Sequence, residues 1–176
     1  MRHLRTCCFI DCSNYGNLSM PSEDYARNFR HKLKEIIENL INNFNVSHFI
    51  SGMELGFEQT SAEILNELKV KYPKVTLEAV LPYENFSINW NEEERDKYYS
   101  LMQNIDKETL LQYHYTKDCI RKRNIFMVNK SNYLILLSSD TSEIYNFILY
   151  AKHNKKAVFI IQPNTINNIS QIRIHR

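Results

Sequence analysis

The feature that most constrains this chain is an alternation of two apolar patterns along its length. Short runs of strand type alternate with longer segments in which apolar residues recur every three or four positions. This order is typical of βαβ units, in which helices join parallel strands and cover both faces of one sheet. We therefore predict a three-layer α/β/α domain with a mostly parallel sheet.

Six runs have the length and composition of strands. They are approximately Thr6 to Ile10, Ser47 to Ser51, Thr76 to Leu81, Glu108 to His114, Tyr133 to Leu137 and Ala157 to Ile161. The segments between them carry amphipathic stripes that are expected to pack on the sheet. The residues predicted to be buried there are Phe29, Leu33, Ile36, Leu40, Leu65, Leu68, Phe147 and Ile148.

Two helix starts have recognisable signals. Ser22 and Asp24 are both competent N-caps, so the first long helix is expected to begin near them. The segment Trp90 to Asn104 opens with the acidic run Glu92-Glu93-Glu94. Carboxylates at a helix N-terminus complement the helix dipole, and we favour that structural interpretation over a catalytic carboxylate pair.

The length and the net charge of the chain limit its domain organisation and the partners that we expect. With 176 residues, the chain has the size of one domain, so we expect a single domain over residues 1–176. Residues 163–176 form either an edge strand or a loose tail in this interpretation. The net charge of +2 gives no broad basic surface, so nucleic acid is not an expected partner. Homo-oligomerisation stays open.

The N-terminal region and the cysteines argue for a cytoplasmic protein without a metal site. The apolar run from Cys7 to Ile10 is too short for a signal-peptide core, and no stretch approaches the about 20 apolar residues that span a bilayer. No membrane partner is therefore expected. The spacing of Cys7, Cys8, Cys12 and Cys119 matches neither a zinc site nor a redox pair, and buried free thiols are predicted.

Candidate binding residues follow the predicted strands, because ligands of open parallel sheets bind at the carboxyl ends of the strands. These residues are Asp11, Ser51, Gly52, Met53, Gly56, Pro82, Tyr83 and Ser139, with Arg123 and Asn124 on the helix before the fifth strand. Gly52 and Gly56 are two of the three glycines in the chain. Their loop can bring a phosphate close to helix-start amides, or it can serve only a tight turn and a helix–strand contact.

Two further features beside this loop have alternative interpretations. In the basic cluster Arg121-Lys122-Arg123, a solvated basic face is the favoured interpretation from the residues alone. The alternative is that helical spacing turns Asn124, and with it Arg123, toward the crevice. Glu54 and Glu58 are the carboxylates beside the glycine loop. Either is a weak candidate for an acid or base if a reaction occurs, and otherwise both are helix-start carboxylates.

Several segments form a recognisable series along nearly the whole chain. They are Phe49 to Gly56, Ser61-Ala62-Glu63, Ala79 to Tyr83, Trp90, Cys119 with Lys122-Arg123-Asn124, Met127-Val128 and Tyr150-Ala151-Lys152. In this order they resemble the YpsA-like family of the SLOG superfamily, whose relatives include the DNA-processing protein DprA and the LOG phosphoribohydrolases. The resemblance implies a Rossmann-like domain whose strand-end loops bind a nucleotide or an ADP-ribose-like ligand. No other cofactor is implied.

The chain departs from the family pattern in two loops. Ile10-Asp11-Cys12-Ser13-Asn14 stands where relatives usually carry Thr-Gly-His-Arg-Pro, and Ser142-Glu143-Ile144 stands where a Gly-Gly-Thr turn is usual. The first change removes an anion contact, and Glu143 would repel a phosphate. No nucleophile, base and orienting group form a visible set.

These observations favour a nucleotide-derived ligand binding or sensing module, with an ADP-ribose-like, NAD-like or nucleoside phosphate ligand. The alternatives are a nucleotide-processing hydrolase of LOG type and a degenerate scaffold that acts through protein contacts. We expect binding without phosphoribohydrolase turnover. A bulky residue at Gly52 is expected to weaken ligand binding more than folding stability.

Overall fold

The strands form one parallel sheet. The computed structural model describes residues 5–12, 22–138 and 141–162, with the backbone alone over 141–144. Its strands are β1 (Arg5–Asp11), β2 (Val46–Ser51), β3 (Thr76–Leu81), β4 (Lys107–Leu110), β5 (Tyr133–Leu137) and β6 (Ala157–Ile161). Their order is β4-β3-β2-β1-β5-β6, and every neighbouring pair is parallel. The chain runs outward from β1 first on one side and then on the other, so β1 lies at a topological switch point.

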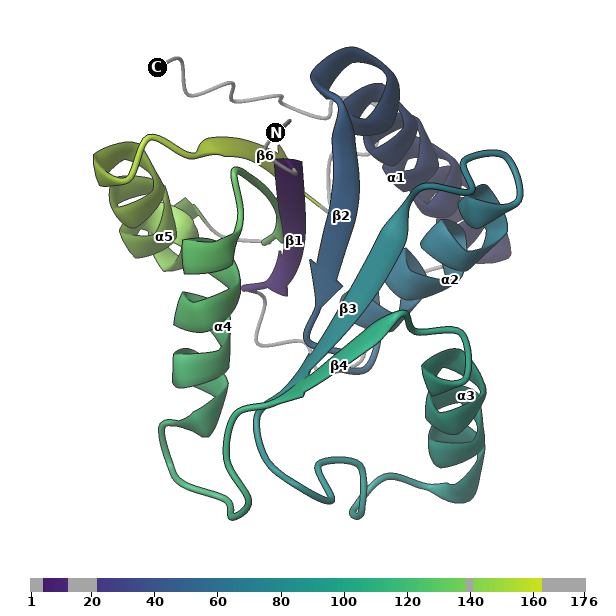
Figure 1. The fold of residues 1–176 in the computed structure, drawn as a ribbon, viewed down its shortest axis with the longest axis vertical. Coiled ribbons are helices and arrows are strands. Elements are labelled where there is room, and N and C mark those ends of the chain that lie inside the picture. Colours follow the sequence, from purple (N-terminus) through teal and green to yellow (C-terminus); the bar gives the residue numbers. More distant parts are fainter. Residues whose placement is uncertain (1–4, 13–21, 139–140, 163–176) are drawn as a thin grey trace.

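Helices cover both faces of this sheet (Figure 1). They are α1 (Glu23–Phe44), α2 (Phe57–Lys69), α3 (Glu92–Met102), α4 (Cys119–Lys130) and α5 (Thr141–His153). The helices α1, α2 and α3 lie on one side, and α4 and α5 lie on the other. The predicted three-layer Rossmann-like architecture is therefore confirmed.

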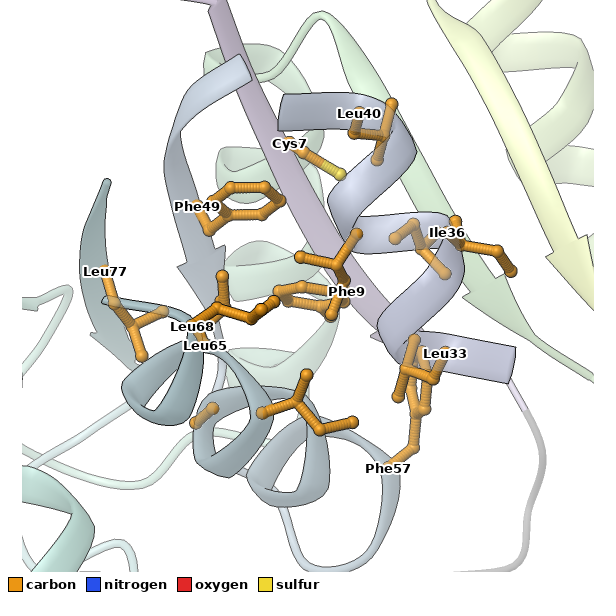
Figure 2. Packing of buried hydrophobic residues seen from close by; sticks show 14 of the residues in the cluster. Cys7, Phe9, Leu33, Ile36, Leu40, Phe49, Phe57, Leu65, Leu68 and Leu77 are labelled. Carbon is orange, nitrogen blue, oxygen red and sulfur yellow. The ribbon is translucent and has the colours of Figure 1, made fainter. Parts of the chain in front are cut away.

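The two faces of the sheet carry separate apolar cores because successive strand residues point to opposite sides. On β1, Cys7 and Phe9 belong to the core under α1, α2 and α3, whereas Cys8 and Ile10 belong to the core under α4 and α5. Figure 2 shows Phe9 at the centre of the first core, among side chains from α1, α2 and the neighbouring strands. Its ring lies 5.9 Å from that of Phe49 in a stacked arrangement.

The amphipathic patterns predicted most of the core correctly. The confirmed buried residues are Phe29, Leu33, Ile36, Leu40, Leu65 and Leu68. Phe147 and Ile148 are only partly buried and pack at the margin of the second core. Their helix, α5, lies against the edge strand β6, where the sheet covers less of a helix stripe than it does at the centre.

Strand and helix ends also follow local signals. Ser22 is the N-cap of α1 and accepts a hydrogen bond from the Tyr25 amide. Asn91 and Glu94 form a capping box at the start of α3, so the acidic run of this segment has the predicted structural role. The fourth strand runs from Lys107 to Leu110 rather than from Glu108 to His114, because its partner β3 ends at Leu81, which pairs with Leu110.

Most of the cysteines are buried, as predicted. Cys7, Cys8 and Cys119 are buried free thiols, whereas Cys12 is half-buried. None of the described helices is long and apolar enough to cross a membrane. Within the described ranges, no group of three or more His, Cys, Asp or Glu side chains could hold a metal ion. The tail from residue 163 lies outside the described residues.

Candidate functional site

The carboxyl ends of β1, β2 and β3 bring the predicted loops together at one edge of the sheet. The loop of residues 52–56 connects β2 to α2, and α4 begins at the same edge after β4. Ser51 fixes the start of this loop, since its hydroxyl accepts from the Met53 amide and donates to the Glu58 carbonyl, each at 3.1 Å. The loop is thus held in one conformation by the chain itself.

A fully buried arginine lies at the centre of this edge. The guanidinium of Arg123 donates to the Gly52 carbonyl at 3.3 Å and to Oε2 of Glu54 at 2.7 Å. It also donates to Oδ1 of Asn124 from Nε and Nη2, at 3.1 and 2.9 Å. Arg123 therefore faces inward and is bound to the chain, so the favoured interpretation of a solvated basic face is wrong for this residue.

Glu58 completes the network from the first turn of α2. Its carboxylate lies 3.5 Å from Nη2 of Arg123 and is also fully buried. The amides of Glu54 and Asp11 donate to its two oxygens, at 3.1 and 3.5 Å. We call Arg123, Glu54, Glu58 and Asn124 the buried ion network.

Burial and charge act in opposite directions on the protonation of this network. Burial raises the pKa of Glu58, Arg123 lowers it, and Glu54 raises it again, with the result that the pKa lies at about 7. For Arg123, burial disfavours the charged form, but Glu58 and Glu54 outweigh that effect and raise its pKa above the ordinary value. Arg123 therefore stays charged while Glu58 can exchange a proton near neutral pH.

Gly52 is the residue that allows this network to pack. A Cβ atom at this position would lie 2.6 Å from Cζ and Nε of Arg123 and 2.6 Å from Oε2 of Glu58. The close approach that sequence reasoning assigned to a phosphate is therefore made by side chains of the protein. Gly56 has a different role, because its φ of 85° lies in the region that favours glycine.

Aromatic side chains lie beside the buried ion network. Tyr83 follows β3 and contacts Tyr115 and Phe86 edge to face, with ring centroids 5.5 and 5.8 Å apart. Burial raises the pKa of Tyr83, and the neighbouring Cys119, Tyr115 and Glu54 raise it further. Tyr83 follows β3 and Glu54 follows the neighbouring parallel strand β2, so the aromatic group and the ion network share the carboxyl edge.

The predicted site residues divide into three groups. The first group consists of the buried ion network and the residues whose groups hydrogen-bond to it. These residues are Asp11, Ser51, Gly52, Glu54, Glu58, Arg123 and Asn124. Met53 instead packs in the core, Gly56 is the N-cap of α2, and Pro82 is buried before Tyr83. Ser139 lies outside the described residues, as do the side chains of Ser142, Glu143 and Ile144 of the second diverged loop.

Two features of the site were missed by sequence reasoning. Glu58 was considered as an acid or base beside the loop, but its pairing with Arg123 was not predicted. Tyr115 was not singled out, although Tyr113 and Tyr115 follow the fourth strand and so reach the ligand edge of the sheet. The position of these tyrosines after a predicted strand was a usable signal. No local signal predicts the ion pair between Glu58 and Arg123.

A separate cavity opens at the amino ends of the strands. It has a volume of about 770 Å³ and is lined by Arg5, Ile41, Asn45, Val46, Ser47, Lys71, Tyr72, Pro73, Lys74 and Val75. The C-termini of α1 and α2 end at this side of the sheet, and their dipoles disfavour an anion there. Ligands of parallel sheets bind at the opposite edge, so we place the candidate site at the carboxyl edge.

Comparison with known proteins identifies the family. Residues 22–166 match the family described as the YspA SLOG family, with the short name YpsA. The chain belongs to the YpsA family. The match includes the buried ion network and Tyr83 and begins after Asp11, in whose loop the sequence departs from the family pattern. The resemblance predicted from the sequence is therefore confirmed.

Similar proteins from several bacteria bear the name UPF0398. The chain is 30% identical over 110 residues to the Lactobacillus acidophilus protein, covering 61% of this chain and 58% of that protein. It is 26% identical over 128 residues to a Staphylococcus epidermidis protein, covering 70% and 64%. The chain thus spans less than two thirds of the length of these relatives, and their names state no ligand or activity.

Proposed function

We propose that this domain binds a nucleotide-derived molecule at the carboxyl edge of its sheet, with Glu54 as the contact to the sugar. The observation that carries the proposal is the buried ion network under the partly exposed carboxylate of Glu54. Replacing a buried ion pair with apolar groups is often neutral or stabilising. An arginine and a glutamate buried together at the carboxyl edge of the sheet are therefore better explained by positioning a site than by stabilising the fold.

Glu54 is the part of the network that a ligand can reach. Its side chain is 34% exposed, whereas those of Arg123 and Glu58 are buried. Arg123 holds one carboxylate oxygen at 2.7 Å, which leaves acceptor capacity for hydroxyl donors. In dinucleotide-binding Rossmann domains, an acidic residue accepts hydrogen bonds from ribose hydroxyls, and Glu54 has the chemistry for that role.

The charge of the network indicates which part of the ligand lies there. Two carboxylates face one guanidinium, so the network has no positive charge to offer a phosphate. Glu58 already takes the amide of Glu54 that could otherwise hold an anion. A sugar hydroxyl therefore fits against Glu54 better than a phosphate does, and a phosphate group of the ligand would lie farther from this carboxylate.

The hydrolase alternative depends on Glu54 rather than on Glu58. Glu58 has a pKa of about 7, which suits an acid–base group, but it is fully buried between Arg123 and Gly52. It therefore cannot touch a substrate in this conformation. Glu54 can, but its carboxylate is held by Arg123, whose guanidinium stays charged and cannot serve as a base. Binding is the function that this geometry favours.

A thermal-shift panel with ADP-ribose, NAD and adenosine monophosphate tests the proposal. A ligand at 100 times its dissociation constant stabilises the native state by about 2.7 kcal/mol, which raises the Tm of a chain of this size by roughly 5 to 11 °C. Glu54→Gln should abolish the shift. Lys74→Gln, in the cavity at the amino ends of the strands, should leave it unchanged. A shift that is lost with Lys74→Gln and kept with Glu54→Gln would place the site at the amino ends of the strands and would contradict the proposal.

Turnover is tested separately by measuring release of free adenine from adenosine monophosphate. We expect none above background from the purified protein. Release that Glu54→Gln or Glu58→Gln abolishes would contradict the binding proposal and support the hydrolase.

A further inference from the structure

Two exposed tyrosines lie in the loop between β4 and α4. Tyr113 is 70% exposed and Tyr115 is 65% exposed. Side-chain hydrogen bonds hold this loop, because Nε2 of Gln112 donates to the His114 carbonyl at 2.5 Å and to the Thr116 hydroxyl at 2.9 Å. The backbone carrying Tyr115 is therefore fixed, although its ring lies largely in water.

Tyr115 is supported from the protein side by a row of aromatic rings. Its ring meets Tyr83 at an interplanar angle of 83°, and Tyr83 meets Phe86 at 90°. Phe86 in turn contacts Trp90 at a centroid distance of 5.1 Å, and Phe86 is buried. The row thus anchors Tyr115 in the fold while leaving most of its ring free to contact another molecule.

The exposed ring of Tyr115 lies at the same edge of the sheet as the candidate sugar contact. Glu54 follows β2 and Tyr83 follows β3, and these two strands pair in parallel. The strand β4, which Tyr115 follows, pairs in parallel with β3, and the loop that carries Tyr115 leads into α4, whose Arg123 donates to Glu54. A ligand that contacts Glu54 through its sugar therefore lies at the same edge as the ring of Tyr115.

We propose that Tyr115, backed by Tyr83, stacks on the base of the ligand whose sugar contacts Glu54. This inference rests on the proposed function and adds the ring-binding part of the same site. The ligand class is then a ribose that carries a planar heterocycle. Every base has a π-face that stacks on an aromatic side chain, so this contact selects for the presence of a base rather than for one base.

Calorimetric titration with adenosine monophosphate and with ribose 5-phosphate separates the base contact from the sugar contact. Alanine substitution of a stacking aromatic residue costs about 1–3 kcal/mol per base, which corresponds to a loss of affinity of roughly 5- to 150-fold. Tyr115→Ala should lower the affinity for adenosine monophosphate by this factor and leave the affinity for ribose 5-phosphate unchanged. Tyr115→Phe should restore the affinity because it keeps the ring.

Tyr145→Ala is the matched control, since Tyr145 is 59% exposed on α5 and should not affect either ligand. Equal affinity of Tyr115→Ala and wild type for adenosine monophosphate, or equal weakening of both ligands, would overturn the stacking proposal. If ribose 5-phosphate still binds and Glu54→Gln abolishes that binding, the proposed function stands and stacking alone fails. If the wild-type protein binds neither ligand, both proposals fail.

Discussion

Gly52→Ala is a direct test of how the buried ion network is packed. The added Cβ would lie 2.6 Å from two Arg123 atoms and 2.6 Å from Oε2 of Glu58, so at least one of these groups must move. Gly56 is the described glycine with positive φ. The effect of Gly52→Ala is therefore steric and includes no backbone strain of that kind.

The expected loss of stability follows from how firmly the two contacted groups are held. Arg123 is fixed by Gly52, Glu54 and Asn124, and Glu58 is fixed by two amides. Overpacking costs about 1–3 kcal/mol, and a displacement that breaks the ion pair costs about 3–5 kcal/mol. With about 2–4 °C of Tm per kcal/mol, we expect the Tm to fall by roughly 2 to 12 °C if the ion pair is kept and by roughly 6 to 20 °C if it breaks.

Ligand affinity should fall together with stability. Displacing Arg123 releases the Glu54 carboxylate that it holds at 2.7 Å, so the same movement disturbs the proposed sugar contact. This differs from the expectation based on sequence, in which binding suffers more than folding. The difference arises because the space beside Gly52 is filled by the protein rather than by a ligand.

A double-mutant cycle with Arg123→Ala identifies the cause. If the steric contact with Arg123 is responsible, the two substitutions should be non-additive by about 0.5–3 kcal/mol in urea denaturation. Gly56→Ala is the control, because its cost comes from a φ of 85° and should add to that of Arg123→Ala. A Tm within about 1 °C of wild type for Gly52→Ala, or additive free energies in the cycle, would refute the reasoning.

Three further perturbations test other parts of the structure. The pKa of Glu58 is raised from 4.5 to about 7, so the folded state retains a proton that the unfolded state releases. The stability from this group is full below about pH 4.5 and lost as the pH rises through about 7. Glu58→Gln should remove a pH slope of up to about 1.4 kcal/mol per unit in urea denaturation, and parallel slopes for variant and wild type would contradict the shift. Arg123→Met should lower the free energy of unfolding by about 3–5 kcal/mol because two carboxylates lose their counter-charge; an unchanged value would mean that the network carries no such interaction. Asn91→Ala removes the cap of α3 and should cost about 1 kcal/mol in thermal unfolding, with ligand affinity unchanged; a loss of affinity would show that α3 contributes to the site.

The elements and their order follow from local patterns. Three strands have the predicted ends, from Thr76 to Leu81, Tyr133 to Leu137 and Ala157 to Ile161. Their apolar runs and the helix stripes depend on side-chain periods of about two and 3.6 residues, which a single sequence displays directly. The caps at Ser22 and Asn91 are local in the same sense, because each hydrogen bond joins residues three positions apart.

The chemistry of the site depends on contacts that no local pattern contains. Arg123 and Gly52 are 71 positions apart, and they meet because β2 and the start of α4 reach the same edge of the sheet. The sequence predicted which loops follow the strands at this edge, and it left an inward-facing Arg123 as the less favoured alternative to a solvated face. It did not predict that Glu58 would fill the space beside Gly52, since no local pattern distinguishes Glu58, in the first turn of α2, from Glu54, in the loop before it. Which of them is buried against the guanidinium and which remains exposed depends on the assembled fold, where burial and the opposite charge act together.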